Sequence, residues 1–249
     1  MIILKSSQEI ETIRKACIIV ADVLERIREL IRPGTSTLTL DDAAERWIRD
    51  AGGLPAFKGY RGYPKTLCTS VNSEVIHGIP SKEVVLKSGD IVSIDVGAIV
   101  EGFYGDAAIT VPVGTVSKEA ERLIRATEES LLRGIEQAKA GKRLYDISHA
   151  VQNHIEAHGY SIVRDYVGHG IGRSLHEDPQ IPNFGSPGQG PRLKPGMVLA
   201  IEPMVNAGGS ATAVKQDGWT AITADGSLSA HFEHTIAITA DGPQVLTRK

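Results

Sequence analysis

Residues 86–95, LKSGDIVSID, and residues 193–202, LKPGMVLAIE, match along their whole length at an offset of 107 residues. In each copy a polar turn with a glycine precedes an apolar run, which is typical of a buried strand. Each run ends on a carboxylate, Asp95 in the first copy and Glu202 in the second. A repeat of this kind predicts a fold of two structurally related halves.

Further matches between the two halves follow in the same order. They are residues 34–52 with 141–159, again at offset 107, residues 77–79 with 169–171, both His-Gly-Ile, and residues 106–110 with 233–237. Each half therefore supplies a histidine loop, a carboxylate that ends a buried strand and a carboxylate that opens a later strand. We expect one domain over residues 1–249, with halves of about 1–115 and 116–249 packed about a pseudo-two-fold axis. Four carboxylates would converge where the halves meet.

The secondary structure predicted from hydrophobic periodicity is of the α+β class. Apolar residues recur at steps of three or four in four segments, which predicts helices; the first begins at a capping box of Ser6 and Glu9 and ends before Pro33. Within each half the helices and strands are grouped rather than alternating, which favours α+β over βαβ units. The other predicted helices span about 40–50, 117–139 and 144–157, and the predicted strands span 91–96, 107–113, 198–205, 211–214, 219–223 and 232–239.

The composition excludes several classes of function. The formal net charge is −3, from 27 Lys and Arg against 30 Asp and Glu, which argues against binding to nucleic acid or an anionic membrane through bulk charge. No apolar run reaches the roughly 20 residues of a membrane-spanning helix, and we find no nucleic-acid-binding motif. The two cysteines, Cys17 and Cys68, cannot form a disulfide scaffold or a Cys-based zinc site. We interpret both cysteines as reduced thiols, and we find no targeting segment in the sequence. Together these two observations predict a cytoplasmic protein.

The carboxylates of the repeat create an electrostatic problem that a metal centre solves. A predicted two-residue turn at 100–101 sets a register that places Asp95 and Asp106 directly opposite each other, about 4.5–5.5 Å apart at Cβ. Both lie in apolar sequence, as do Glu202 and Glu233. Buried carboxylates at such a short distance repel each other unless they are paired with a cation or bound to a metal. Two divalent cations would neutralise the four charges, and one histidine ligand would favour Mn, Fe, Co or Zn over Ca or Mg. The pattern therefore predicts a dinuclear metal centre.

Each of these residues taken alone has a simpler interpretation. A single aspartate in a strand is usually an edge or turn residue, and a single loop histidine such as His77 or His169 is usually held by hydrogen bonds. Their repetition in glycine-flanked loops favours functional roles. His154 and His158 share one face of the fourth predicted helix and could bind a metal, although a solvent-exposed helix face is the more common arrangement.

Nearly the whole chain resembles the type I methionine aminopeptidases, metallopeptidases of the pita-bread fold. The matching stretches are residues 59–64, 68–80, 94–97, 105–106, 168–172, 176–179, 202–204, 217–219 and 232–235. This resemblance implies two pseudo-two-fold-related halves with helices packed on a curved antiparallel sheet. It also implies two divalent metal ions, Co, Mn, Fe or Zn, whose ligands would be Asp95, Asp106, His169, Glu202 and Glu233.

The resemblance implies roles for further residues. A water bridging the metals would be the nucleophile, with Glu202 as acceptor of its proton. His176 would stabilise the oxyanion or hold the substrate carbonyl, and His77 would assist departure of the scissile amide nitrogen. The substrate site would comprise Phe57, Tyr60, Tyr63, Cys68, Leu175 and Trp219 with His77 and His176, and Asn72 and Ser229 would hold a monovalent cation. Leu175 stands where the family often has phenylalanine.

The function implied by the resemblance is removal of the initiator methionine from nascent proteins, with preference for a small second residue. The expected partners are nascent polypeptide N-termini, which could be met at the ribosome, and the expected state is a monomer. Two alternatives stay open: an Xaa-Pro peptidase of the same fold and a metal-free pita-bread binding protein. Relatives of the first kind usually carry an extra N-terminal domain, whereas this chain opens with the first catalytic helix. The second kind has lost its ligands, whereas all five ligand types occur here.

Overall fold

A computed structural model describes residues 1–248, which form four α-helices, a short 3-10 helix and fifteen strands. The helices are α1 (Ser7–Leu30), α2 (Thr37–Asp50), α3 (Lys118–Gln137) and α4 (Leu144–Ala157), with the 3-10 helix at Tyr60–Gly62. The strands of the first half are β1 (Leu54–Pro55), β2 (Leu67–Val71), β3 (Glu74–Ile76), β4 (Ile91–Val100) and β5 (Phe103–Pro112). Those of the second half are β6 (Ser161–Ile162), β7 (Gly168–Gly170), β8 (Glu177–Ile181), β9 (Val198–Ile201), β10 (Met204–Asn206), β11 (Thr212–Val214), β12 (Ala221–Thr223), β13 (Ser229–His231), β14 (Glu233–Thr239) and β15 (Gly242–Val245).

The helices begin where the sequence supplies capping residues. The predicted capping box of α1 is present, because the Ser6 hydroxyl accepts from the Glu9 backbone N–H and the Glu9 carboxylate accepts from the Ser6 N–H. Helix α2 begins at Thr37, earlier than predicted, because the Ser36 hydroxyl accepts from the Thr39 N–H. All four predicted helices are confirmed, with bounds that differ by a few residues at most.

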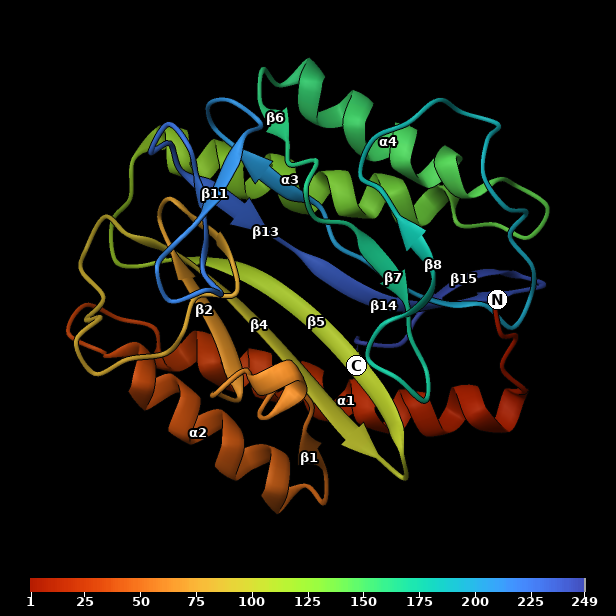
Figure 1. Ribbon diagram of the computed structural model, residues 1–249, viewed down its shortest axis with the longest axis horizontal. Helices are drawn as coiled ribbons and strands as arrows, with labels where there is room; N and C mark the ends of the chain where they lie inside the picture. Colours follow the sequence, from red (N-terminus) through yellow and green to blue (C-terminus); the bar gives the residue numbers. More distant parts are fainter. Residues whose placement is uncertain (249) are drawn as a thin grey trace.

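The main sheet carries the internal repeat. Its strand order is β1-β4-β5-β14-β9-β7-β8, with β2 and β15 paired to β4 and β14, and every pairing is antiparallel. The central order β4-β5-β14-β9 takes one antiparallel pair from each half, so exchange of the halves leaves it unchanged. In the view of Figure 1, α1 and α2 lie below the central strands and α3 and α4 lie above them. These features confirm the predicted α+β class with two similar halves on a curved antiparallel sheet.

The β4–β5 hairpin differs from its predicted register. Val100 pairs with Phe103, so the turn lies at residues 101–102, and Asp95 pairs with Ala108 instead of Asp106. The prediction of directly opposed aspartates is therefore wrong. Both turn residues have positive φ, 51° and 79°, as a type I′ turn requires, and glycine at position 102 adopts this conformation without strain. A turn at 100–101 would force it on a β-branched valine. The aspartates sit diagonally, two positions apart in register.

The apolar stretch 198–205, predicted as one strand, is two. Strand β9 ends at Ile201 in the main sheet, and β10 begins at Met204 in a small sheet with β13 and β6. Pro203 between them cannot donate a ladder hydrogen bond, which explains the break. Glu202 consequently lies at the junction of two sheets, free of regular strand pairing.

Each half buries its own core beneath its own helices. One cluster of buried side chains packs α1 and α2 on the sheet and includes Leu40 and Ile94, and another packs α3 and α4 on the sheet and includes Leu131 and Ile236. Cys17 on α1 is fully buried, as its place on the apolar stripe predicted. The seam between the halves is therefore flanked by two packed cores.

A single added methyl group at Gly105 should loosen the contact between α1 and the sheet. An ideal Cβ at this position in β5 would lie 2.7 Å from the Cys17 backbone nitrogen and 2.8 Å from its Sγ. We expect Gly105→Ala to lower the free energy of unfolding by about 1–3 kcal/mol, as overpacking usually does. Gly209→Ala is the matched control, because its Cβ would come no nearer than 3.6 Å to another residue. Urea unfolding of the three proteins makes the comparison, and equal stability of Gly105→Ala and the unmodified chain would contradict it.

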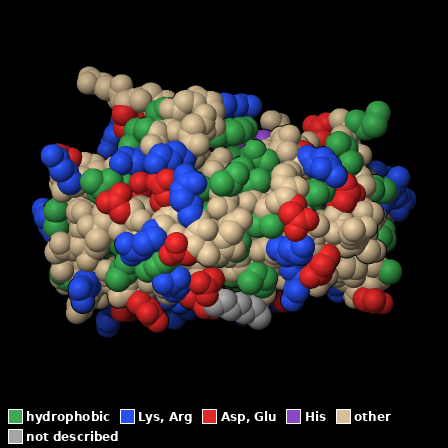
Figure 2. Space-filling view, turned by 90° about the horizontal axis from the view of Figure 1, so that it is seen from below, with side chains coloured by type: hydrophobic (Ala, Val, Ile, Leu, Met, Phe, Trp, Pro, Cys, Tyr) green, Lys and Arg blue, Asp and Glu red, His purple; other side chains and the backbone are tan. Residues whose placement is uncertain are grey.

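The surface agrees with the near-neutral charge. Figure 2 shows Lys and Arg side chains interspersed with Asp and Glu over the face seen from below, with neither sign dominant. Across residues 1–248, none of the helices combines the length and the apolar character needed to cross a membrane.

Candidate metal centre

The structure brings together the five candidate ligands from five neighbouring strands. Along the order β4-β5-β14-β9-β7, they are Asp95 in β4, Asp106 in β5, Glu233 at the start of β14, Glu202 directly after β9 and His169 in β7. Neighbouring strands lie about 4.8 Å apart, so one cluster can collect a side chain from each only because the sheet curls. The curvature at the seam thus builds the cluster.

The distances within the cluster are those of a compact coordination sphere. His169 Nε2 lies 3.4 Å from Glu202 Oε1 and 3.9 Å from Asp106 Oδ2. One donor atom each of Asp106, His169 and Glu233 lies within 4.8 Å of the others. His169 Nδ1 lies 3.0 Å from the Gly170 carbonyl oxygen, which can only accept, so Nδ1 carries the proton and Nε2 presents its lone pair to the carboxylates.

The carboxylates are buried without adequate partners. Asp106 and Glu233 are 4% and 2% exposed. Within residues 1–248, Asp95 Oδ1, Asp106 Oδ1 and Glu233 Oε1 are buried and have no hydrogen-bond partner, and no Lys or Arg forms an ion pair with any carboxylate of the cluster. Leaving a buried carboxylate unsatisfied costs several kcal/mol.

The pKa values of the four carboxyl groups also show that their ionised forms are unfavourable here. Burial raises the pKa of all four carboxyl groups, that of Asp95 to about 7 and those of Asp106, Glu202 and Glu233 well above their usual range. For Asp106 and Glu233, repulsion from neighbouring carboxylates raises the pKa further. Negative charge is thus unfavourable at this place unless a cation compensates it.

These residues fit divalent metal ions. Unsatisfied carboxylate oxygens and one imidazole nitrogen converge on one point, which is a donor set suited to Mn, Fe, Co or Zn. The orphaned oxygens, which no other described group explains, are the observation that carries this fit.

A cavity of about 200 Å³ opens beside the cluster and collects the other predicted residues. It is lined by Phe57, Tyr60, Arg61, Tyr63, Cys68, His77, Asp95, Asp106, His169, Leu175, His176, Glu202, Trp219 and Glu233. Its volume lies below the about 300–1,000 Å³ of sites for drug-sized ligands, so it suits a single amino-acid side chain. The candidate ligands make part of its lining polar, and residues such as Phe57, Tyr63 and Trp219 make part of it aromatic and apolar.

Two further histidines, His77 and His176, line the same cavity. His77 has a positive φ of 60°, a strained conformation that is typical of functional positions, and its ring contacts Trp219 at 6.4 Å between centroids. Burial lowers the pKa of His77 to about 4. The His176 ring lies 4.3 Å from that of His169, and its Nδ1 is 2.8 Å from the Tyr60 hydroxyl. Burial, and then the charge of Arg61, lower the pKa of His176, so both rings are neutral at pH 7.

The wall residues are held rigidly. The Tyr63 hydroxyl lies 2.9 Å from the Leu67 carbonyl and 3.0 Å from the Gly78 carbonyl, and its ring meets Trp219 edge-on at 5.1 Å. Tyr63 therefore offers its ring, and not its hydroxyl, to the cavity. Burial raises the pKa of Cys68, with the Asp95 charge as a second cause, so this side chain is a neutral thiol.

Sequence reasoning missed His231 and Arg61. His231 is 1% exposed, and its Nε2 lies 3.6 Å from Glu202 Oε2. It stands two positions before Glu233, and period-two alternation in 229–235 could have indicated it. Arg61 lines the cavity next to Tyr60, and its charge gave no signal because loop arginines are common.

Asn72 and Ser229 lie together but outside the residues that line the cavity. The Ser229 N–H donates to the Asn72 carbonyl at 2.9 Å. The Asn72 amide bonds Asp90 and the Ile91 N–H, and the Ser229 hydroxyl bonds the Asn206 side chain at 2.9 Å. The monovalent-cation site stays a prediction.

Comparison with known proteins places the chain among metallopeptidases. The model of metallopeptidase family M24 matches residues 11–240. The chain is 54% identical over 248 residues to methionine aminopeptidase 1 of Bacillus subtilis, with all of both chains covered. Its structure superposes on that of methionine aminopeptidase from Thermotoga maritima with a TM-score of 0.99 at 51% identity, again over both whole chains.

A more distant relative bears on the Xaa-Pro alternative. The prolidase of Pyrococcus horikoshii shares 26% identity at a TM-score of 0.81, but the match covers 99% of this chain and only 64% of that one. The methionine aminopeptidases and the prolidase thus share the pita-bread architecture. The chain length and the sequence identity both favour the methionine aminopeptidases over the Xaa-Pro peptidases. The chain belongs to metallopeptidase family M24 and, within it, to the methionine aminopeptidases.

Proposed function

We propose that this protein is a metal-dependent aminopeptidase that removes the initiator methionine from nascent proteins and prefers a small second residue. Its relatives over the full chain are methionine aminopeptidases. The observation that carries the proposal is the cavity itself, in which five candidate metal ligands are joined by an aromatic and thiol-lined wall. Such a wall suits the polarisable thioether of methionine.

Asp95, Asp106, His169, Glu202 and Glu233 would hold two divalent ions, Co, Mn, Fe or Zn. When bound, such ions supply Lewis acidity and lower the pKa of water. The four carboxylates then exchange mutual repulsion for attraction to the cations. Asp106 and Glu233, the most enclosed pair, would face the ions with the oxygens that otherwise lack partners.

Glu202 is proposed to accept the proton of the attacking water. It lies at the junction of β9 and β10, unconstrained by strand pairing, and is the carboxylate nearest to His169. Its side chain also lines the cavity, and a glutamate carboxylate is one of the usual general bases of enzymes. It can afterwards deliver the proton toward the leaving amine.

His77 and His176 are proposed to orient the scissile amide. Both rings are neutral, so each can donate one N–H hydrogen bond without adding a charge. The contact of His176 Nδ1 with the Tyr60 hydroxyl fixes the plane of its ring, and His77 is fixed between Trp219 and Tyr166. Donors held in this way can stabilise charge that develops on the carbonyl oxygen.

His77→Ala should lower kcat/KM for Met-Ala-Ser by about 100-fold while leaving the bound metal unchanged. The expected loss is that of one positioned hydrogen-bond donor or proton-transfer group. Because His77 is outside the carboxylate cluster, elemental analysis should find the metal content of the unmodified protein. His149→Ala, on the exposed face of α4, is the control and should keep full activity. Full activity of His77→Ala would remove this residue from the mechanism.

A peptide series separates the proposed function from its alternatives. We expect release of free methionine from Met-Ala-Ser, slower release from Met-Leu-Ser and none from N-acetylated Met-Ala-Ser. An Xaa-Pro peptidase would instead prefer Ala-Pro, and a metal-free binding protein would cleave none of the peptides with or without added Mn or Co. Chromatography of the free amino acids gives the answer, and faster cleavage of Ala-Pro than of Met-Ala-Ser would overturn the proposal.

The biological setting follows from the proposed substrate. Initiator methionine is exposed as chains leave the ribosome, so we propose cytoplasmic action on nascent N-termini, with the protein as a monomer. The two buried thiols, Cys17 and Cys68, agree with a reducing compartment. A monovalent cation near Asn72 and Ser229 belongs to the same proposal.

A further inference from the structure

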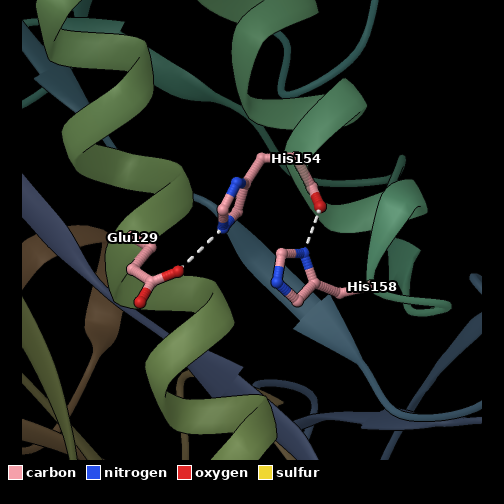
Figure 3. Close-up of side chains that lie close together, drawn as sticks. All are labelled: Glu129, His154 and His158. Atoms are coloured by element: carbon pink, nitrogen blue, oxygen red, sulfur yellow. Dashed lines mark hydrogen bonds and ion pairs between the residues drawn. The ribbon is translucent and has the colours of Figure 1, made fainter.

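A second group of metal-binding side chains lies between α3 and α4. Glu129 comes from α3, and His154 and His158 come from the end of α4 (Figure 3). One donor atom of each lies within 4.8 Å of a donor atom of both others. The three do not occur among the described residues that line the substrate cavity, so this group is separate from the centre discussed above.

The tautomer of His158 is fixed by the backbone. Its Nδ1 lies 2.7 Å from the carbonyl oxygen of His154. Because that oxygen can only accept, Nδ1 carries the proton, and Nε2 of the neutral ring keeps its lone pair. Figure 3 shows Nε2 on the side of the ring that faces His154 and Glu129. A hydrogen bond of this kind is the usual support of a metal-binding histidine.

His154 supplies the second nitrogen. Its Nε2 is buried, and its one recorded partner within residues 1–248 is Glu129 Oε2 at 3.3 Å, drawn as a dashed line in Figure 3. Two ligands at about 2.0–2.2 Å from zinc and at the tetrahedral angle are about 3.3–3.6 Å apart. The separation of His154 and Glu129 therefore already matches two ligands of one tetrahedral ion.

The local charges favour a cation on balance. His154 lies in the last turn of α4 and His158 is its C-cap, where the helix dipole attracts positive charge. Glu129 adds a full negative charge. Arg133 on α3 opposes a cation, since its charge contributes to the lowered pKa of His154, but it is itself paired with Glu136 at 3.7 Å.

We propose that Glu129, His154 and His158 bind one divalent transition-metal ion, with zinc as the reference ion, and thereby tie the end of α4 to α3. Two imidazoles and one carboxylate suit Zn²⁺, Ni²⁺ or Cu²⁺ and do not suit Mg²⁺ or Ca²⁺. Three protein ligands leave the remaining positions of the ion to water. The side chain of His158 is exposed and lies at the helix end. Its ring can therefore move the short distance to an ion held by Glu129 and His154 without separating the two helices.

The test counts zinc bound per chain in matched variants. Protein is dialysed against graded Zn²⁺, and bound metal is measured by elemental analysis for the unmodified chain, Glu129→Gln, His158→Gln and His149→Gln. His149 lies exposed on the same helix outside the group and is the control. We expect one zinc fewer in Glu129→Gln and His158→Gln at concentrations that saturate the unmodified chain, and a full count in His149→Gln. Loss of a ligand should weaken this site by more than about 100-fold, beyond the 10–100-fold cost of losing a supporting residue.

Two further readouts make the result decisive. Zinc should raise the unfolding temperature of His149→Gln more than that of Glu129→Gln, because only the former keeps the link between α3 and α4. Hydrolysis of Met-Ala-Ser with added cobalt should be equal in all four proteins. Equal activity would show that the substitutions leave the candidate catalytic centre intact, so a lost zinc ion can be assigned to the site between α3 and α4. Equal zinc counts in all four proteins, or a count lowered as much in His149→Gln as in the others, would overturn the proposal.

Discussion

His169→Ala is expected to lower hydrolysis of Met-Ala-Ser by at least about 1,000-fold while the chain stays folded. His169 is the only imidazole among the five ligands, and its Nε2 faces Glu202 and Asp106 at 3.4 and 3.9 Å. Metal ions contribute several kcal/mol to such reactions, and about 4 kcal/mol corresponds to about 1,000-fold in rate. Because burial lowers the pKa of His169 to about 3, the ring is neutral in the metal-free protein, and its removal leaves no unpaired buried charge.

The measurement pairs steady-state kinetics with elemental analysis and circular dichroism. We expect His169→Ala to lose bound metal along with activity and to keep its secondary structure. His234→Ala is a demanding control, because His234 is also largely enclosed and lies next to Glu233, yet its Nδ1 bonds the Thr247 hydroxyl at 2.9 Å. It should keep its metal. A His169→Ala protein with normal metal content and activity would show that β7 contributes no ligand.

Glu202→Gln is expected to reduce kcat by about 100- to 10,000-fold, the range for loss of a general base. Glutamine has the shape of glutamate but cannot accept the proton of the attacking water. The substitution replaces a buried carboxyl group, whose ionisation burial opposes by raising its pKa, with a neutral amide. The metal-free variant should therefore be at least as stable as the metal-free unmodified protein, even though its activity is lost.

Kinetics and thermal unfolding of the two metal-free proteins test this opposition of activity and stability. Glu121→Gln, on the exposed face of α3, should change neither quantity. A Glu202→Gln protein with lower stability and nearly normal kcat would assign Glu202 a structural role, and the proton acceptor would have to be sought elsewhere in the cavity.

The repeat was the part of the sequence from which most of the fold could be predicted. Its offset of 107 residues relates β4 to β9, which begin at Ile91 and Val198. Period and capping signals located the helices because these signals act within one or two turns. The carboxylates could be found before the structure because a strand that buries a charge breaks the hydrophobic pattern.

Details that depend on long-range packing could not be predicted. The hairpin register was wrong by two positions because positive φ at residues 101 and 102, not the hydrophobic pattern, sets the turn. Short strands such as β7 and β13 have three residues each, too few for a periodic signal. The proximity of Glu129 to His154 depends on how α3 packs on α4, and local sequence carries no record of that packing.

We propose that the buried carboxylates and His169 form a divalent-metal centre that releases N-terminal methionine by hydrolysis. The most direct measurement is the activity and unfolding temperature of chelator-treated protein before and after addition of Co²⁺ or Mn²⁺, with Asp106→Asn in parallel. We predict that the chelator abolishes methionine release and lowers the unfolding temperature, that either ion restores both, and that Asp106→Asn regains neither. Full hydrolysis of Met-Ala-Ser by protein shown by elemental analysis to be free of metal would contradict a metal-dependent mechanism.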